Sequence, residues 1–233
     1  MYRESKPETF ILNPQINKIF HTMRVIMFCR IFCCIQLDIE AKGDLNNMPI
    51  QITEEMIRRA REEAHRRDAY ITHHFEVEHL TGEERDIIGF LGEFACCEFL
   101  GINWEDNIRE SYLTIDTGDI EHNNLVYDVK SETLPREYLQ KVYTRNIGDD
   151  EKWGRRLINE KQVPLLRNYD VVIFGGFVRG EDNLEWYPFG YLETNHILQE
   201  YEVTSQRPDG GYYPYPALPI KTSELKDINE LKA

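Results

Sequence analysis

The sequence predicts an α/β domain over residues 48–233. Three observations support this class. A chain of 233 residues that is 41% hydrophobic and 12% aromatic can bury a sizeable core and is not wholly disordered. Residues 53–68 and 81–100 repeat apolar side chains at helical spacing. Residues 169–178 form a continuous apolar run, which is typical of a buried strand.

Residues 1–47 read unlike the remainder, and we interpret them as a poorly ordered or dispensable N-terminal extension. They lack sustained periodicity, and a polar stretch at residues 41–47 separates them from the domain. Either Met48 is the functional start, or the extension is loosely ordered. The long apolar run at residues 25–37 is interrupted by Arg30 and is shorter than the roughly 20 residues of a spanning helix. We therefore expect no membrane segment, and no signal peptide because a small-residue cleavage site is absent.

Charge and cysteine content narrow the functional classes. The formal net charge of the chain is −14. Residues 1–47 hold six basic and five acidic residues, a balance of +1, so residues 48–233 have a net charge of −15. This excess repels phosphate backbones, which argues against a passive nucleic-acid coating protein but not against an enzyme whose carboxylates hold a metal ion. The five cysteines include two adjacent pairs and no C-x-x-C motif, which indicates a reducing, cytoplasmic location. Cys96 and Cys97 lie in an apolar helix and are expected to be buried thiols.

The first expected helix spans residues 53–68. Thr53 can cap it, and the acidic Glu54 and Glu55 suit the positive end of the helix dipole. Its arginines form either a solvated face paired with glutamates at i,i+4 spacing or a face that contacts phosphates.

The second expected helix begins at a capping box formed by Thr81 and Glu84. It should run to Leu100, with Gly101 as its C-terminal stop. Its apolar positions describe a broad buried face.

Glu93 lies within this second helix and is flanked by Gly89 and Gly92, which let another backbone come close. A carboxylate among such neighbours lies either at the rim of the apolar stripe or against a functional partner.

Strand patterns follow. Residues 112–115 and 125–129 read as an antiparallel hairpin, with the turn at residues 121–124. We expect a helix-prone segment at residues 136–166 and buried strands at residues 169–178 and 185–192. The tail at residues 207–219 reads as irregular, and residues 223–231 read as a short helix.

Three charged residues of the hairpin are candidates for chemistry. Asp128 and Lys130 project from the same face of one strand because strand side chains repeat every second residue. Asp119 on the partner arm can reach Asp128 through the short turn. Two carboxylates in close approach repel each other unless a divalent cation compensates them, and oxygen ligands suit Mg²⁺. Lys130 could then orient or help deprotonate a metal-activated water, and Glu93 could supply a third acid directly or through water.

This order of residues resembles the PD-(D/E)xK, or restriction-endonuclease-like, nuclease superfamily. The resemblance covers residues 84–192: Gly92-Glu93 on a helix, Gly118-Asp119-Ile120, Tyr127-Asp128-Val129-Lys130-Ser131, and the strand at residues 169–178. It implies a mixed central β-sheet flanked by helices and Mg²⁺-dependent hydrolysis of DNA, or less often RNA, with Mn²⁺ as a substitute. It also implies Asp119 and Asp128 as metal ligands, Lys130 as the water-positioning residue and Glu93 as the helix-borne acid.

Two features of the motif depart from the superfamily pattern. Gly118 replaces the usual Pro, and the spacing from Asp119 to Asp128 is short, so Asp116 is the fallback for the first acid. The alternative to a nuclease site is structural: an ordinary cross-strand ion pair between Asp128 and Lys130, with Asp119 as a turn residue.

Phosphate contacts are expected where the chain is locally basic. Residues 130–167 carry nine basic and six acidic residues, among them Arg145, Arg155 and Arg156 as weak candidates for nucleic-acid binding. Trp153 could stack on bases or pack inward as part of an ordinary surface helix.

The sequence thus predicts a metal-dependent nuclease whose partner is nucleic acid, most simply DNA, with a homodimer as an open option and no membrane partner. The rival is a non-catalytic nucleic-acid-binding or assembly module on the same fold. A third reading is a phage or mobile-element accessory protein that acts on another phosphoester.

Overall fold

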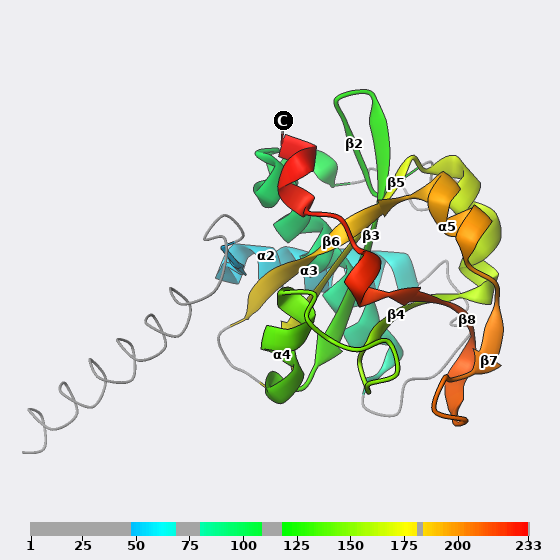
Figure 1. The fold of residues 1–233 in the computed structure, drawn as a ribbon. Helices are drawn as coiled ribbons and strands as arrows, with labels where there is room; N and C mark the ends of the chain where they lie inside the picture. Colours follow the sequence, from blue (N-terminus) through cyan, green and yellow to red (C-terminus); the bar gives the residue numbers. More distant parts are fainter. Residues whose placement is uncertain (1–47, 69–79, 109–117, 181–183, 233) are drawn as a thin grey trace, which may run out of the picture. The chain divides into compact units, whose positions relative to one another are not determined.

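A computed structural model describes residues 48–68, 80–108, 118–180 and 184–232 (Figure 1). The predictions for the extension at residues 1–47, the hairpin arm at residues 112–115 and Asp116 lie outside the described residues. All described residues belong to one compact unit.

The described residues contain α-helices and short 3-10 helices. Their bounds are α2 (Glu54–Asp68), α3 (Gly82–Leu100), η1 (Trp104–Asn107), α4 (Arg136–Tyr143), η2 (Glu160–Asn168), α5 (Thr194–Glu200), η3 (Thr222–Glu224) and η4 (Ile228–Lys232). Within the ranges described, none of them combines the length and the apolar character needed to cross a membrane.

The strands form two sheets (Figure 1). The bounds of the strands are β1 (Ile50–Gln51), β2 (Ile120–His122), β3 (Leu125–Leu134), β4 (Arg155–Asn159), β5 (Val171–Val178), β6 (Glu185–Glu193), β7 (Thr204–Gln206) and β8 (Tyr212–Lys221). The larger sheet has the order β1-β6-β5-β3-β2, in which β3 and β5 are parallel and the other pairs are antiparallel. The smaller sheet has the order β4-β8-β7. The predicted α/β class with a mixed sheet is therefore confirmed.

Both predicted long helices begin where their capping residues place them, and α3 also ends at its predicted stop. The Thr53 Oγ1 accepts a hydrogen bond from the Met56 amide at 3.2 Å, so Thr53 caps α2. Both hydrogen bonds of the capping box between Thr81 and Glu84 are present at the start of α3. Gly101 ends α3 in the left-handed conformation with φ 76°, which glycine adopts at little cost.

Strand β5 lies at the centre of the larger sheet and is buried along its whole length. Its alternate side chains enter two different cores: Val171, Ile173 and Phe177 pack with α2 and α3, whereas Val172, Phe174 and Val178 pack with residues of α4, β4 and β8. Both faces of the sheet are thus covered, which explains why the strand reads as a continuous apolar run.

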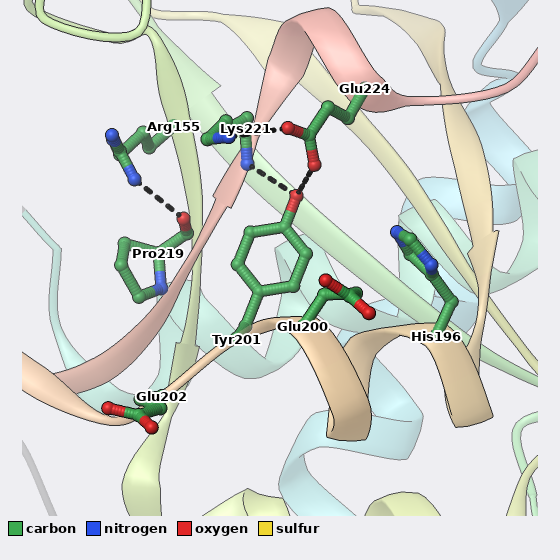
Figure 2. A pocket seen from close by; sticks show the side chains of 8 residues that line it. All are labelled: Arg155, His196, Glu200, Tyr201, Glu202, Pro219, Lys221 and Glu224. Carbon is green, nitrogen blue, oxygen red and sulfur yellow. Dashed lines mark hydrogen bonds and ion pairs between the residues drawn. The ribbon is translucent and has the colours of Figure 1, made fainter.

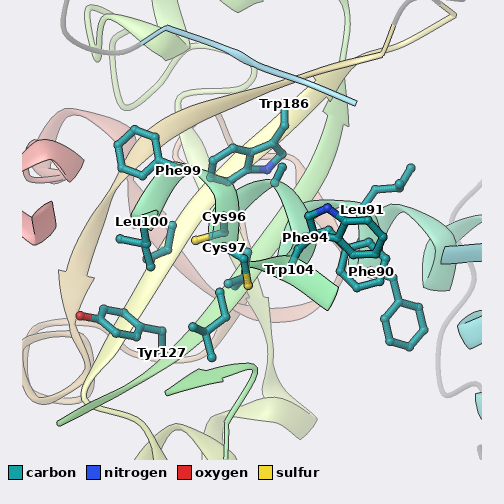
Figure 3. Close-up of a cluster of buried hydrophobic side chains, with 14 of the residues drawn as sticks. Phe90, Leu91, Phe94, Cys96, Cys97, Phe99, Leu100, Trp104, Tyr127 and Trp186 are labelled. Atoms are coloured by element: carbon teal, nitrogen blue, oxygen red, sulfur yellow. The ribbon is translucent and has the colours of Figure 1, made fainter. Parts of the chain in front are cut away.

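The core on the α3 side is rich in aromatic side chains (Figure 3). Phe94 packs against Trp104 with ring centroids 4.9 Å apart, and Phe99 packs edge-on against Trp186 at 6.5 Å. Cys96 and Cys97 are fully buried free thiols in the same core, as predicted.

The predicted hairpin exists with a shorter turn and a different first arm. Strands β2 and β3 are joined by Asn123 and Asn124, whose φ angles of 51° and 61° suit a two-residue hairpin turn. The first arm is therefore Ile120–His122, which includes two residues of the predicted turn. Ile120 pairs with Tyr127 at the end of β2, and the Asp119 amide donates a hydrogen bond to the Tyr127 carbonyl, which brings Asp119 next to the part of β3 that holds Asp128.

Two predictions for the C-terminal half are wrong. The segment predicted as helix-prone contains strand β4 between α4 and η2, and the tail predicted as irregular forms strand β8. Strand β4 pairs with residues 217–221 of β8, and β7 pairs within residues 212–217. Among the described strands, most of β8 therefore has one edge without a partner, and proline is tolerated at such an edge because it has no amide hydrogen to donate.

Gly92 allows α3 to lie against β3. A Cβ added at Gly92 would lie 1.9 Å from Ser131 Oγ, and that hydroxyl also accepts a hydrogen bond from Trp186 Nε1 at 3.1 Å. A Cβ at Gly89 would meet nothing within 4 Å. The prediction of a close approach is therefore correct for Gly92 and wrong for Gly89.

Gly92→Ala is expected to lower the free energy of unfolding by about 2 kcal/mol, because α3 or Ser131 must move to admit the methyl group. Gly89→Ala is the matched control, since it adds the same methyl group to the same helix in open space. It should leave stability unchanged or raise it by up to about 1 kcal/mol. Urea denaturation of the two variants and the parent checks this, and equal stabilities would contradict the close packing of α3 on β3.

Candidate functional site

Asp128 and Lys130 are neighbours on one face of β3. Tyr127 and Val129 point into the core on the α3 side, so Asp128 and Lys130 lie on the opposite face. Lys130 Nζ donates a hydrogen bond to Asp128 Oδ1 at 2.6 Å. Asp128 is only 2% exposed, whereas the Lys130 side chain is 22% exposed. Lys130 is thus the member of the pair that solvent or a substrate can reach.

Asp119 is fixed beside this pair by the end of the hairpin. Its amide donates to the Tyr127 carbonyl at 2.9 Å, and its carbonyl accepts from Asn107 Nδ2 at 2.9 Å. Its side-chain Oδ2 accepts from the Val129 amide at 2.8 Å. Two hydrogen bonds therefore hold the Asp119 main chain, and a third holds its carboxylate against β3, beside Asp128.

The surroundings of Asp128 disfavour its charge. Burial raises the pKa of Asp128 to about 6, the attraction of Lys130 opposes this, and the Asp119 carboxylate raises the pKa further. Asp128 Oδ2 is buried and accepts no hydrogen bond from any described residue. An ionised Asp128 therefore has one oxygen bonded to Lys130 and one oxygen that lacks a positive partner.

Lys130 remains a cation at neutral pH. Burial works against its charge, but the attraction of Asp128 and Asp119 outweighs burial and raises the pKa of Lys130 above its usual value. A protonated ammonium donates hydrogen bonds and accepts none. Of the two roles open to Lys130 from sequence, orienting a water is therefore favoured over deprotonating it.

Glu93 is buried, at 7% exposed, on α3 and therefore on the other side of the sheet from Asp128 and Lys130. Burial raises the pKa of the Cys97 thiol to about 12, and the charges of Glu93 and Asp119 raise it further, so both acids lie near that thiol. Across residues 48–68, 80–108, 118–180 and 184–232, no three or more His, Cys, Asp or Glu side chains are arranged to hold a metal ion. The structure thus gathers Asp119 with Asp128, and the role of Glu93 stays a prediction.

A divalent cation fits the aspartate pair by its chemistry. Mg²⁺ binds proteins through one or two carboxylates and keeps several waters, so it does not need three side chains. If such an ion were bound, the unpartnered Oδ2 of Asp128 and the adjacent Asp119 carboxylate would be two such ligands. Such an ion would also remove the repulsion that raises the pKa of Asp128.

The basic residues predicted to contact phosphates are held by the fold. Arg156 is 2% exposed and forms an ion pair with Glu132, so its burial argues against the predicted contact with nucleic acid. Arg145 is half-buried and donates to the Phe189 carbonyl at 3.3 Å. Arg155 is also half-buried and donates to the carbonyls of Asp149 and Pro219 at 3.1 and 3.3 Å. Nucleic-acid binding through Arg145 and Arg155 stays a prediction.

Trp153 packs against protein rather than standing free. Its ring lies 6.3 Å from the Tyr138 ring and 5.6 Å from the Arg179 guanidinium. The inward-packing alternative therefore describes it better than a free base-stacking platform, although Trp153 lies in the loop before β4 rather than on a helix.

Glu132 is the charged residue of this face that the sequence interpretation missed. It follows Lys130 by two residues on the same strand, so the alternation that joined Asp128 to Lys130 also places Glu132 on their face. Its partner Arg156 comes from β4, which was not predicted, and no sequence signal joins the two.

A separate polar pocket of about 410 Å³ lies over α5 and β8 (Figure 2). Two of its charged side chains pair with each other: Lys221 Nζ lies 2.5 Å from Glu224 Oε1, and the Tyr201 hydroxyl donates to the same glutamate. Apart from Arg155, it contains none of the residues predicted for the site.

Comparisons of the chain with protein-family models, with curated proteins and with solved structures find no match.

Proposed function

We propose that this chain is a divalent-metal-dependent nuclease that hydrolyses phosphodiester bonds, with DNA as its substrate. One observation carries the proposal: the buried Asp128 Oδ2 has no described hydrogen-bond donor and lies beside a second carboxylate, Asp119, and the ammonium of Lys130. Such a charge arrangement costs stability unless a cation completes it. The resemblance to the PD-(D/E)xK superfamily supports the same assignment. In that resemblance Asp119 and Asp128 match the two acidic positions of the motif, and Lys130 matches its lysine.

Each residue has a defined task in this proposal. Asp119 and Asp128 hold the metal ion, which when bound supplies Lewis acidity to a water and to the phosphate. Lys130, anchored on Asp128 and still partly exposed, donates a hydrogen bond to the attacking water or to a phosphate oxygen. The protonated ammonium also stabilises the negative charge that develops on the phosphate.

The acidity of the domain sets a limit on substrate binding. With −15 on residues 48–233, the field of the protein repels a polyanion, so we expect weak substrate binding. The metal ion and Lys130 therefore supply the attraction locally.

The direct test is incubation of the purified chain with supercoiled, linear and single-stranded DNA and with RNA. Each substrate is tested with Mg²⁺, with Mn²⁺, with Ca²⁺ and with a chelator. We expect cleavage of DNA with Mg²⁺ or Mn²⁺ and none with the chelator, because the two aspartates need a cation to act.

The outcome that contradicts the proposal is equally defined. A chain that binds DNA, as judged by mobility shift, and cleaves no substrate with any of the three metal ions would be a nucleic-acid-binding module. Cleavage that persists in the chelator would exclude the metal-dependent mechanism.

A further inference from the structure

Lys130 has two carboxylates at equal sequence distance on its own strand face. Asp128 precedes it by two residues and Glu132 follows it by two, so all three side chains leave the same face of β3. Residues two apart on a strand are separated by roughly 7 Å, which a lysine side chain can span in either direction. The sequence of the strand alone therefore allows the ammonium to bond to either acid.

Arg156 binds one of these two acids, Glu132. Its guanidinium forms an ion pair with Glu132 through Nη1 and donates through Nη2 to the Trp153 carbonyl. It also lies 5.6 Å over the ring of Phe189. At 2% exposed it is enclosed by the core between β3 and the β4-β8 sheet, so its position is set by packing.

We propose that Arg156 is a positioning residue of the site: by holding Glu132, it leaves the Lys130 ammonium bonded to Asp128. The arrangement agrees with this assignment, since Lys130 Nζ lies 2.6 Å from Asp128 while Glu132 faces Arg156. The consequence for catalysis rests on the proposed function, whereas the choice of partner by Lys130 does not.

The loss of Arg156 would change which carboxylate the Lys130 ammonium binds. Glu132 would keep a carboxylate that is only 31% exposed, and Lys130 is the nearest cation on its strand face. If the ammonium turned to Glu132, Asp128 would lose the hydrogen bond to its Oδ1 while its Oδ2 already lacks one. Arg179 is the competing cation, because its Nη2 donates to the Thr133 carbonyl at 3.4 Å, next to Glu132.

The partner of Lys130 can be read by NMR of lysine Nζ groups in the full chain, without a substrate. An ammonium held in a buried ion pair exchanges its protons slowly, and Lys130→Arg assigns its signal by removing it. We expect Arg156→Met to move this signal or to broaden it beyond detection. The double variant Arg156→Met/Glu132→Gln, which has no charged competitor, should restore the parental signal.

Three results would overturn the proposal. The Lys130 signal could remain unchanged in folded Arg156→Met, as expected if Glu132 turns to Arg179 or to water. It could fail to return in the double variant, or it could be equally altered in Arg156→Lys, which keeps the charge. If Arg156→Met does not fold, Arg156→Gln replaces it, since glutamine keeps a hydrogen-bond donor toward Trp153 without the charge.

Cleavage gives the second readout and separates the two hypotheses. Misplacement of Lys130 should lower kcat by about 10²-fold with little change in KM, and the double variant should recover most of this loss. If the parent chain cleaves nothing, the proposed function fails while the NMR comparison still decides the role of Arg156.

Discussion

Asp128→Asn and Lys130→Met are each expected to lower Mg²⁺-dependent DNA cleavage by about 10³-fold, because each removes a preorganised charge from the reacting centre. Asparagine keeps the shape of the aspartate but is a poor ligand for a divalent cation. Methionine keeps the apolar stem of the lysine and loses the ammonium that is 2.6 Å from Asp128. Initial cleavage rates at saturating metal concentration measure both effects.

The matched control for these variants is Lys226→Met. Lys226 Nζ lies 2.6 Å from Glu193 in an exposed ion pair outside the basic stretch of residues 130–167, so the substitution removes the same chemical group from another ion pair. It should cleave DNA at the parental rate. If Asp128→Asn and Lys130→Met also cleave at the parental rate while folded, Asp128 and Lys130 do not form the active site.

The fold could be predicted where the signal is local. The capping box of Thr81 and Glu84 and the stop at Gly101 satisfy backbone groups within one turn, so sequence alone defines both ends of α3. Strand β5 could be predicted because burial on both faces leaves a continuous apolar run.

Strands β4 and β8 could not be predicted, because their partners are distant in sequence. Leu157 of β4 pairs with Pro219 of β8, and neither strand carries a turn or periodic signal that specifies the other. The composition of β8 favours irregular structure, and pairing with β4 and β7 overrides it.

In the candidate site, too, the contacts between neighbours in sequence could be predicted, and the contacts between distant strands could not. The pairing of Asp128 with Lys130 follows from strand alternation, and the approach of Asp119 follows from a hairpin closed by Asn123 and Asn124. The burial of Arg156 depends on the packing of β4 against β3, so a residue that reads as a surface cation is in fact a core ion-pair partner of Glu132.

Asp128 is also expected to make the chain less stable as the pH rises from about 4 to about 6. Its pKa is raised from 3.8 to about 6 in the folded chain, mainly by burial. Well below pH 3.8 the carboxyl is protonated in both the folded and the unfolded chain and contributes nothing. Between these values the unfolded chain loses the proton first, so ionisation at higher pH costs the folded chain up to about 3 kcal/mol.

The measurement is the difference in free energy of unfolding between the parent and Asp128→Asn from pH 3.5 to 7.5. Asparagine cannot ionise, so the variant should equal the parent near pH 3.5 and exceed it by up to about 3 kcal/mol above pH 6. Other carboxyls titrate in the same window, and the difference cancels those that the two chains share.

Mg²⁺ connects this instability to function. An ion that binds the folded aspartate pair and not the unfolded chain stabilises the parent in proportion to its occupancy, and more at pH 7 than at pH 4, where protons compete with it. Asp128→Asn should gain little from the ion at either pH. A parent chain whose stability at pH 7 is the same with Mg²⁺, with Mn²⁺ and with a chelator would show that the unpartnered carboxylate of Asp128 does not bind these cations. An equal response of the parent and Asp128→Asn would place the ion elsewhere on the chain.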